Sequence, residues 1–253
     1  MNNRLIAVSL IAAASAASAQ VDSFFVNERV FNDNSASSLS ITGASGAVNG
    51  ANITIEEQFF TGNSGANRHD ILLSDDGGAS ARVFPSNRAF RLSADVNLAV
   101  TVNAPRKEAG IRINSNVTND TLFIINSDAG EIVSFGGGAA FNSFGNNGGG
   151  NGYTPGTTIT MGIEYRPGVG GNPATLEYFI DRGAGLETSG PLAYGNNEGQ
   201  PVDFNVGFYG QFQYPGGGFE TNTATFSNVS FIPTPASAAL LAMGGLAASR
   251  RRR

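Results

Sequence analysis

The segment Phe90–Thr101 restricts the possible folds of this chain more than any other. Apolar residues occupy every second position from Phe90 to Val100, and mostly polar residues fill the positions between them. Successive side chains of a β-strand point to opposite faces, so this period of two is typical of an antiparallel sheet with one face on a hydrophobic core. The segment therefore predicts a protein built from sheets.

The same alternation recurs along the chain and predicts further strands. These strands are Phe24–Val30, Leu39–Ile41, Asn52–Phe60, Asp70–Leu73, Ala81–Phe84, Ala109–Ile113, Thr157–Arg166, Ala174–Arg182, Phe204–Tyr214 and Thr221–Ile232. An Asp-x-Gly turn within Thr121–Phe135 predicts a hairpin, and the broken pattern near Phe226 predicts a bulge. The Gly- and Asn-rich segment Gly136–Gly152 predicts a long loop.

Composition supports a single β-sandwich. The chain has 253 residues, 34 glycines and no cysteine, so its stability has to come from a packed core rather than from disulfides. No segment of the body has a helical period, and no internal repeat indicates a solenoid or a propeller. We expect one all-β domain at residues 20–232, because sandwiches of this length commonly fold as single domains.

The N-terminal residues 1–19 predict a secretory signal peptide. Arg4 provides positive charge, an apolar run follows it, and the small residues Ala17 and Ala19 stand before a cleavage site that leaves Gln20 first. A retained membrane anchor is the alternative, but the run is short. We therefore expect the protein to be exported.

The C-terminal residues 233–253 have three parts: Pro233-Thr234-Pro235, an apolar run of small residues, and a basic end of four arginines, Arg250, Arg251, Arg252 and Arg253. The apolar run is shorter than the roughly 20 residues that span a bilayer, and terminal arginines resist translocation. This order of parts resembles the PEP-CTERM sorting signals, with Thr234 where that family usually has Glu. The resemblance covers these residues only. It implies an apolar helix, short-lived membrane attachment and an exosortase-type membrane protease as partner; a plain weak anchor is the alternative.

The body between the two ends is acidic. Without Arg4 and the four terminal arginines, 10 of the 15 basic residues remain against 20 acidic ones, which gives a net charge of −10. This charge argues against nucleic acid and anionic membranes as partners of the body.

A second resemblance concerns the body. The segment Ile163–Gly183 reads IEYRPGVGGNPATLEYFIDRG. It is similar to a hairpin of concanavalin A-like lectin and laminin G-like domains, in which one strand ends in Tyr and the next in Asp-Gly. Arg182 separates Asp181 from Gly183 here, which departs from that pattern. The strand FRLSADVNL also resembles the one that opens the core of those domains. The resemblance covers residues 84–232 and implies a jelly roll, although other sandwiches have similar strands.

Few residues suggest catalysis. His69 is the only histidine, and we expect it in a loop rather than in a triad with Asp70 and Ser74. With no cysteine, a zinc site is close to excluded. The strand motif of jelly-roll glucanases, Glu-x-Asp-x-(x)-Glu, is missing, although Glu164 and Glu177 could be cross-strand neighbours. We therefore expect that the protein is not an enzyme.

Metal binding has weak candidates. Asp75, Asp76 and the turn Asn126-Ser127-Asp128 could offer oxygen ligands to calcium. Their spacing matches no diagnostic loop, and Asp and Asn are common in turns for geometric reasons. We expect no cofactor.

One face of the segment Phe204–Tyr214 suggests sugar binding, because aromatic rings and amides suit pyranose rings. The candidate residues are Tyr209, Gln211 and Gln213, with Glu164 and Arg166 on a neighbouring strand. Three functions remain open: a structural or interaction protein of the cell surface or extracellular polysaccharide, which we favour; a carbohydrate-binding module; and a glycoside hydrolase with a divergent site.

Overall fold

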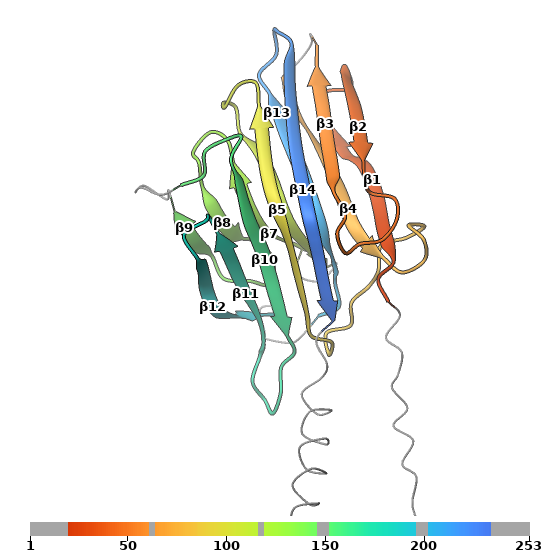
Figure 1. Cartoon of the computed structure of the whole chain (residues 1–253), viewed down its shortest axis with the longest axis vertical. Helices are drawn as coiled ribbons and strands as arrows, with labels where there is room; N and C mark the ends of the chain where they lie inside the picture. The colour runs from red at the N-terminus through yellow and green to blue at the C-terminus, as the bar shows by residue number, and fades with distance from the viewer. Residues whose placement is uncertain (1–19, 61–63, 116–118, 146–151, 196–201, 234–253) are drawn as a thin grey trace, which may run out of the picture.

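The structure, a computed structural model, describes residues 20–60, 64–115, 119–145, 152–195 and 202–233 (Figure 1). The predicted signal peptide and the sorting signal beyond Pro233, including its apolar helix and its arginines, lie outside the described residues.

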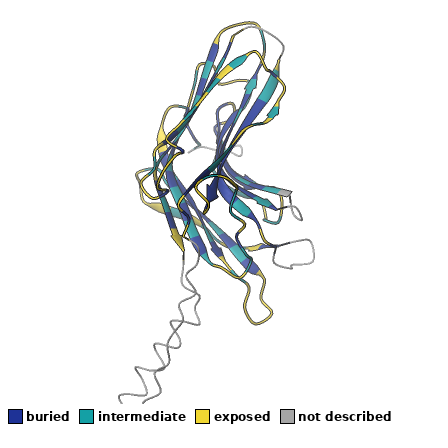
Figure 2. Ribbon diagram, turned by 90° about the vertical axis from the view of Figure 1, so that its right-hand side faces the viewer, coloured by how far each residue is buried: buried dark blue, intermediate teal, exposed yellow. Residues whose placement is uncertain are grey.

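The described chain forms two antiparallel sheets that pack face to face (Figures 1 and 2). Sheet A contains, in spatial order, β1 (Ser23–Asn32), β4 (Gly65–Ser74), β13 (Asn205–Tyr214), β6 (Lys107–Ser115), β7 (Asn119–Asn126), β8 (Ile132–Phe135) and β9 (Asn142–Gly145). Sheet B contains β12 (Leu186–Tyr194), β11 (Ala174–Asp181), β10 (Thr158–Arg166), β5 (Phe90–Val100), β14 (Glu220–Pro233), β3 (Ile53–Phe59) and β2 (Ser37–Thr42). The antiparallel β-sandwich expected from the sequence is confirmed.

Strand β5 lies at the centre of sheet B between β10 and β14. Its alternating apolar residues from Phe90 to Leu98 are almost completely buried between the sheets. Each large apolar side chain buried in this way contributes roughly 2 kcal/mol through removal of its surface from water. Figure 2 shows the buried residues along the strands of both layers and most exposed residues in the loops.

The bulge predicted in the last strand is present. The pairing of β14 with β5 shifts register between Ser227 and Ser230, and Asn228 has a φ of 53°. Asparagine tolerates this left-handed conformation better than most residues. The shift lets β14 continue beside β5 to Pro233, which pairs with Phe90. The first proline of the predicted sorting motif is therefore the last residue of the sheet.

Three details differ from the sequence prediction. Residues 81–84 form no strand, because only Phe84 makes an isolated bridge, to Phe204. Strand β12 was not predicted, since Gly190 and Pro191 interrupt its weak alternation. The predicted loop at residues 136–152 contains the short strand β9.

Both ends of the described chain, Gln20 and Pro233, lie at the same end of the sandwich, at the bottom of Figure 1. The connection between β13 and β14 and the end of β3 lie at the opposite end. Among the residues that the structure describes, no helix is long and apolar enough to cross a membrane.

Candidate functional site

The outer face of sheet A carries an unusual density of charge. Strands β4, β13, β6 and β7 are neighbours there, and their residues alternate between the core and this face. We call the charged set on this face, with the two charged residues next to it, the arginine–carboxylate strip. It consists of Arg68, Asp70, Arg106, Glu108, Arg112, Asp120 and Glu131.

Four members of the strip form a closed ring of ion pairs. Arg68 Nε lies 3.1 Å from Asp70 Oδ1, and Arg68 Nη1 lies 2.9 Å from Asp120 Oδ2. Arg112 Nη1 lies 2.5 Å from Asp70 Oδ2, and Arg112 Nη2 lies 2.7 Å from Asp120 Oδ1. Each arginine therefore bridges both carboxylates, which fixes all four side chains in one arrangement.

Glycine makes this ring possible. Arg112 on β6 reaches Asp70 on β4 across β13, and its direct neighbour on β13 is Gly207. A Cβ atom at Gly207 would lie 2.2 Å from the carbonyl oxygen of Ile71 and 2.6 Å from Leu72 Cα. Only glycine fits this position, because those contacts involve backbone atoms that cannot move away cheaply.

Burial and charge act in opposite directions on the ring. Burial raises the pKa of the Asp70 carboxyl, against the pull of Arg68 and Arg112. For Asp120, burial opposes the shift, but the hydrogen bond from Arg112 and the positive charge of Arg68 lower the pKa. Asp120 is the more exposed of the two, with 27% of its side chain accessible. Asp120 is therefore the carboxylate of the ring that a ligand could reach.

The second half of the strip is organised around Tyr209. Its hydroxyl donates a hydrogen bond of 2.9 Å to Glu108 Oε2, and Arg106 Nε lies 2.6 Å from Glu108 Oε1. Arg106 also pairs with Glu131 at 2.9 Å. The guanidinium of Arg68 lies over the Tyr209 ring, 5.1 Å from its centroid, which links the two halves of the strip.

Tyr209 is fully buried, although it points away from the main core. Its ring packs with Ile124 and Val133 in a small separate apolar cluster. Burial and the adjacent Glu108 raise the pKa of the Tyr209 hydroxyl well above its ordinary value. The phenol therefore keeps its proton at any physiological pH.

The accessible part of this face is polar. Gln211 and Gln213 are partly exposed on β13, as is Asn114 on β6. Asn114 donates a 2.7 Å hydrogen bond to Asp120 Oδ1, and Arg106 has 30% of its side chain exposed. These groups offer hydrogen-bond donors and acceptors next to the buried charges, since Gln211 is the cross-strand neighbour of both Arg68 and Glu108.

The structure separates the residues that the sequence suggested for sugar binding. Tyr209, Gln211 and Gln213 lie on the outer face of sheet A, whereas Glu164 and Arg166 lie on the opposite side of the molecule, on β10 of sheet B. They do not form one surface. Tyr209 cannot stack on a sugar, because its side chain has no accessible area.

Glu164 and Glu177 are cross-strand neighbours, as the sequence suggested. Arg166 contacts both of them, with Nε 2.8 Å from Glu164 and Nη1 2.9 Å from Glu177. The three side chains form a partly exposed ion-pair cluster rather than an opposed pair of free carboxylates.

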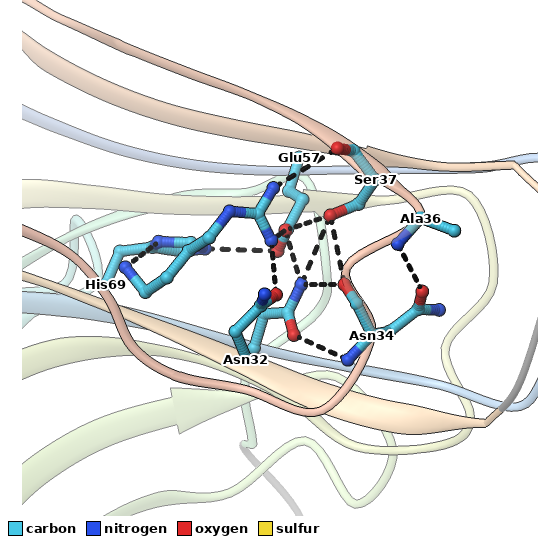
Figure 3. A network of polar contacts seen from close by, with 8 residues as sticks. Asn32, Asn34, Ala36, Ser37, Glu57 and His69 are labelled. Carbon is cyan, nitrogen blue, oxygen red and sulfur yellow. Dashed lines mark hydrogen bonds and ion pairs between the residues drawn. The ribbon is translucent and has the colours of Figure 1, made fainter.

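His69 is not a loop residue, contrary to expectation. It lies in β4 with its side chain fully buried on the core side, whereas Asp70 points to the outer face. Figure 3 shows its surroundings: Nε2 lies 3.1 Å from Glu57 Oε2, and Nδ1 accepts a hydrogen bond from the backbone N–H of Arg29. Ser37 Oγ donates to the same Glu57. The carboxylate, not the histidine, is central, so this is no nucleophilic triad.

The calcium candidates are engaged in turns. Asp76 accepts hydrogen bonds from Ser74 and Ser80, and Asn126 Oδ1 accepts from the N–H groups of Ala129 and Glu131. No group of three or more His, Cys, Asp or Glu side chains in the described part of the chain is arranged to hold a metal ion.

No protein-family model matches the chain, and no curated protein matches its sequence. Its fold is similar to that of alginate lyase A1-II', a member of polysaccharide lyase family 7, with 12% identity and a TM-score of 0.49 over 72% of this chain and 80% of the lyase. Alginate lyase vAL-1 from Chlorella virus has 13% identity and a TM-score of 0.44 over 83% and 91% of the two chains. The lectin UEA-II, solved with galactose, has 7% identity and a TM-score of 0.40 over 81% and 97%. At these identities the likeness concerns the fold alone.

The comparison overturns the expectation that this chain is not an enzyme. That expectation rested on the missing carboxylate motif of jelly-roll hydrolases. Alginate lyases are among the solved structures with a similar fold, and for a lyase, a different class of enzyme, a search for that motif is no test. The missing motif therefore does not exclude catalysis.

Proposed function

We propose that this chain is an exported carbohydrate-recognition protein and that the outer face of sheet A binds the glycan. The observation that carries this proposal is the layered arrangement of that face. A buried layer of ion-paired charges borders partly exposed polar groups: Gln211 lies between Arg68 on β4 and Glu108 on β6, Gln213 follows on the same face of β13, and Asp120 has 27% of its side chain accessible. Sites that recognise small polar ligands use a few groups held in place by a second layer in this way.

The charge of the face favours a neutral, hydroxyl-rich glycan. Each of the three arginines, Arg68, Arg106 and Arg112, is paired with two carboxylates, so the strip has no excess positive charge. A polyanion such as alginate would meet these carboxylates and a body of net charge −10. Hydroxyl groups both donate and accept hydrogen bonds, which matches the mixture of carboxylates, amides and a guanidinium.

A glycan array with neutral and acidic polysaccharides tests this proposal. We expect binding to at least one neutral polysaccharide, and weaker binding of it by the double variant Gln211→Ala/Gln213→Ala. The control is Thr175→Ala on β11, which changes a partly exposed residue of sheet B. Equal affinity of the double variant and the control for every neutral polysaccharide, or binding to acidic polysaccharides only, would refute the proposal.

A second candidate is chemical action on the bound glycan, and one observation favours it. The Tyr209 hydroxyl and the Glu108 carboxylate form a hydrogen-bonded pair beneath the same face. If ligand binding exposes the pair, the Tyr209 hydroxyl can give its proton to the leaving glycosidic oxygen while the Glu108 carboxylate takes a proton from the water that attacks the anomeric carbon, and Glu108 then returns that proton to the phenolate. Incubation with the bound polysaccharide should then shorten the chain, and Tyr209→Phe should stop the reaction while binding continues. Equal rates for Tyr209→Phe and the unchanged protein would remove this candidate.

Export and C-terminal sorting complete the proposal. Their support is the sequence of residues 1–19 and 233–253 together with the position of Pro233, which leaves the sheet directly into the motif. Mass spectrometry of the mature protein from its host should find Gln20 as the first residue and no peptide beyond about Pro235. An intact end at Arg253 in the membrane fraction would indicate a plain anchor instead.

A further inference from the structure

The outer face of sheet B differs in chemistry from that of sheet A. Strands β2, β3 and β14 are neighbours, and their outward positions are almost free of charge. In β2, β3 and the part of β14 from Glu220 to Thr225 there are nine such positions, of which seven carry hydroxyl groups, one an amide and one an acid. They are Ser38, Ser40, Thr42, Thr54, Glu56, Gln58, Thr221, Thr223 and Thr225.

The strand register arranges these side chains in rows. Thr42, Thr54 and Thr225 are direct cross-strand neighbours, and the row continues through Asn97 on β5 to Thr158 on β10. Neighbouring strands lie about 4.8 Å apart, and residues two apart along a strand lie about 6.7 Å apart. The face therefore presents a regular array of hydrogen-bonding groups with Glu56 as its one charged member, and we call it the hydroxyl face.

Two phenylalanines lie at the distal end of the hydroxyl face. Phe60 follows β3 and Phe219 precedes β14, directly beyond the cross-strand pair Phe59–Glu220. Their rings are tilted with centroids 6.0 Å apart, and the two residues are 45% and 62% exposed. This end is the one opposite Pro233 (Figure 1). Exposure of two adjacent large rings works against solubility and stability unless they bind something.

The backbone that carries the two rings is held in place. The hydroxyl of the buried Tyr214 lies within hydrogen-bond distance of the carbonyl oxygens of Phe60 and Gly218 and accepts a 2.8 Å hydrogen bond from the Gly218 N–H. Its ring stacks on Phe59 with centroids 5.0 Å apart. One buried phenol therefore ties together the two connections that present the exposed rings, so the aromatic pair is preorganised.

The size of the aromatic pair decides what it can bind. A phenylalanine side chain offers at most about 200 Å², so the two rings together expose roughly 200 Å². A stable protein interface needs about 800 Å² from each partner. The pair is therefore too small to hold a second copy of the chain by itself, and the acidic body disfavours an anionic membrane. A single sugar ring has the right size and can place its apolar face on an aromatic ring.

We propose that the hydroxyl face is a second glycan site, in which one sugar ring stacks on Phe60 and Phe219 and the following rings of a neutral chain lie along β14. Thr221 to Thr225 and the neighbouring Gln58 and Thr54 contact the sugar hydroxyls. From Phe219 to Thr225 the strand covers about 20 Å, enough for several rings. This site stands on its own residues and does not depend on the sheet A site.

Two glycan sites on opposite faces have a functional consequence. The hydroxyl face and the arginine–carboxylate strip are on the outer faces of the two layers, so one short stretch of glycan does not contact both. A protein with both sites can join two polysaccharide chains, and the second contact then benefits from the high effective concentration that the first creates.

NMR titration with hexasaccharides of neutral glucose, xylose, mannose and galactose polymers, and with an alginate hexasaccharide, tests this second site. We expect at least one neutral probe to shift the ring-proton signals of Phe60 and Phe219. Phe219→Ser and Phe60→Ser should each weaken binding at this site about two- to twelvefold, as expected from the 0.5–1.5 kcal/mol of an aromatic contact. The control is Val169→Ser, which removes a 72% exposed apolar side chain elsewhere.

The titration tests the two proposed glycan sites independently, because each site has its own NMR signals. No ring-proton shift with any neutral probe, or equal affinity in the two Phe variants and the control, would overturn the second site. Shifts of Gln211 and Gln213 would still show whether the sheet A site exists. Binding of the chain to anionic phospholipid vesicles that both Phe variants abolish would also overturn the proposal and assign the rings to a membrane.

Discussion

The buried carboxylate of Glu57 should be one of the most sensitive positions of the fold. It has no accessible area, and it accepts hydrogen bonds from Ser37 Oγ at 2.7 Å and Asn67 Nδ2 at 2.6 Å (Figure 3). It also lies 3.1 Å from His69 Nε2 and 3.0 Å from Arg29 Nη1. Glu57→Gln keeps the shape of this side chain and removes its charge.

The cost follows from the hydrogen-bond roles around Glu57. Nδ1 of His69 accepts from the Arg29 N–H, so the proton of the neutral ring is on Nε2 and points at Glu57. A glutamine has one acceptor oxygen where the carboxylate has two, and its NH₂ group faces another donor. An orphaned buried donor costs about 1–3 kcal/mol, and weakened charge-assisted bonds add to this. We expect Glu57→Gln to lose about 3 kcal/mol of the free energy of unfolding, a large part of the 5–15 kcal/mol typical of a folded protein.

Guanidinium chloride unfolding at pH 7 measures this loss, and Glu56→Gln is the matched control. Glu56 is the neighbouring residue, points to the outer face of sheet B and is partly exposed, so its loss should change stability by less than about 0.5 kcal/mol. A loss below about 0.5 kcal/mol for Glu57→Gln, or equal losses for both variants, would refute the reasoning.

The stability difference should also depend on pH. Burial opposes the shift, but the hydrogen bonds from His69, Ser37 and Asn67 lower the pKa of Glu57 below its ordinary 4.5. A lowered carboxyl pKa contributes stability that is present above the ordinary value and is lost as the pH falls through the folded-state value. The curves for the unchanged protein and for Glu57→Gln should therefore approach each other below about pH 4.

Three further predictions concern single residues. Hydrogen bonds from Ser80 and Ser74 lower the pKa of the exposed Asp76 to about 2, so an NMR titration of its carboxyl should have a midpoint near that value; a midpoint close to 3.8 would contradict these hydrogen bonds. Gly207→Ala should destabilise the protein by about 3 kcal/mol or prevent folding. Gly218→Ala is the control and should be nearly neutral, because the space around Gly218 is open. Similar thermal midpoints for the two variants would contradict the close contact of Gly207 with the backbone of β4. Arg166→Ala should change stability by less than about 1 kcal/mol, because water screens the half-exposed ion pairs of Arg166 with Glu164 and Glu177. A larger loss of stability in denaturant unfolding would mean that these ion pairs are structurally important.

The strands with one buried face were predictable from the sequence. In β5 every apolar residue except Ala99 faces the core and the polar ones face out, so alternation alone defines the strand and its orientation. In β4 the pattern fails, because both faces are buried and Arg68 and Asp70 are among the buried residues. Their partners, Arg112 and Asp120, lie on strands that are distant in sequence, and alternation contains no information about such pairing.

The candidate site shows the same limit. The sequence correctly indicated that Tyr209, Gln211 and Gln213 share one face of a strand. It could not show that Tyr209 is covered, because the covering residues, Ile124 and Val133, come from β7 and β8. It also grouped residues of β13 with residues of β10, because strand order across two sheets cannot be read from alternation.

The most direct test of the central claim is an NMR titration that follows the side-chain amide signals of Gln211 and Gln213. Neutral hexasaccharides and an alginate hexasaccharide are the probes. The proposal predicts that at least one neutral probe shifts both amide pairs, and that alginate shifts them less at the same concentration. No shift with any neutral probe, or a shift with alginate alone, would contradict the assignment of the outer face of sheet A as a site for neutral glycans.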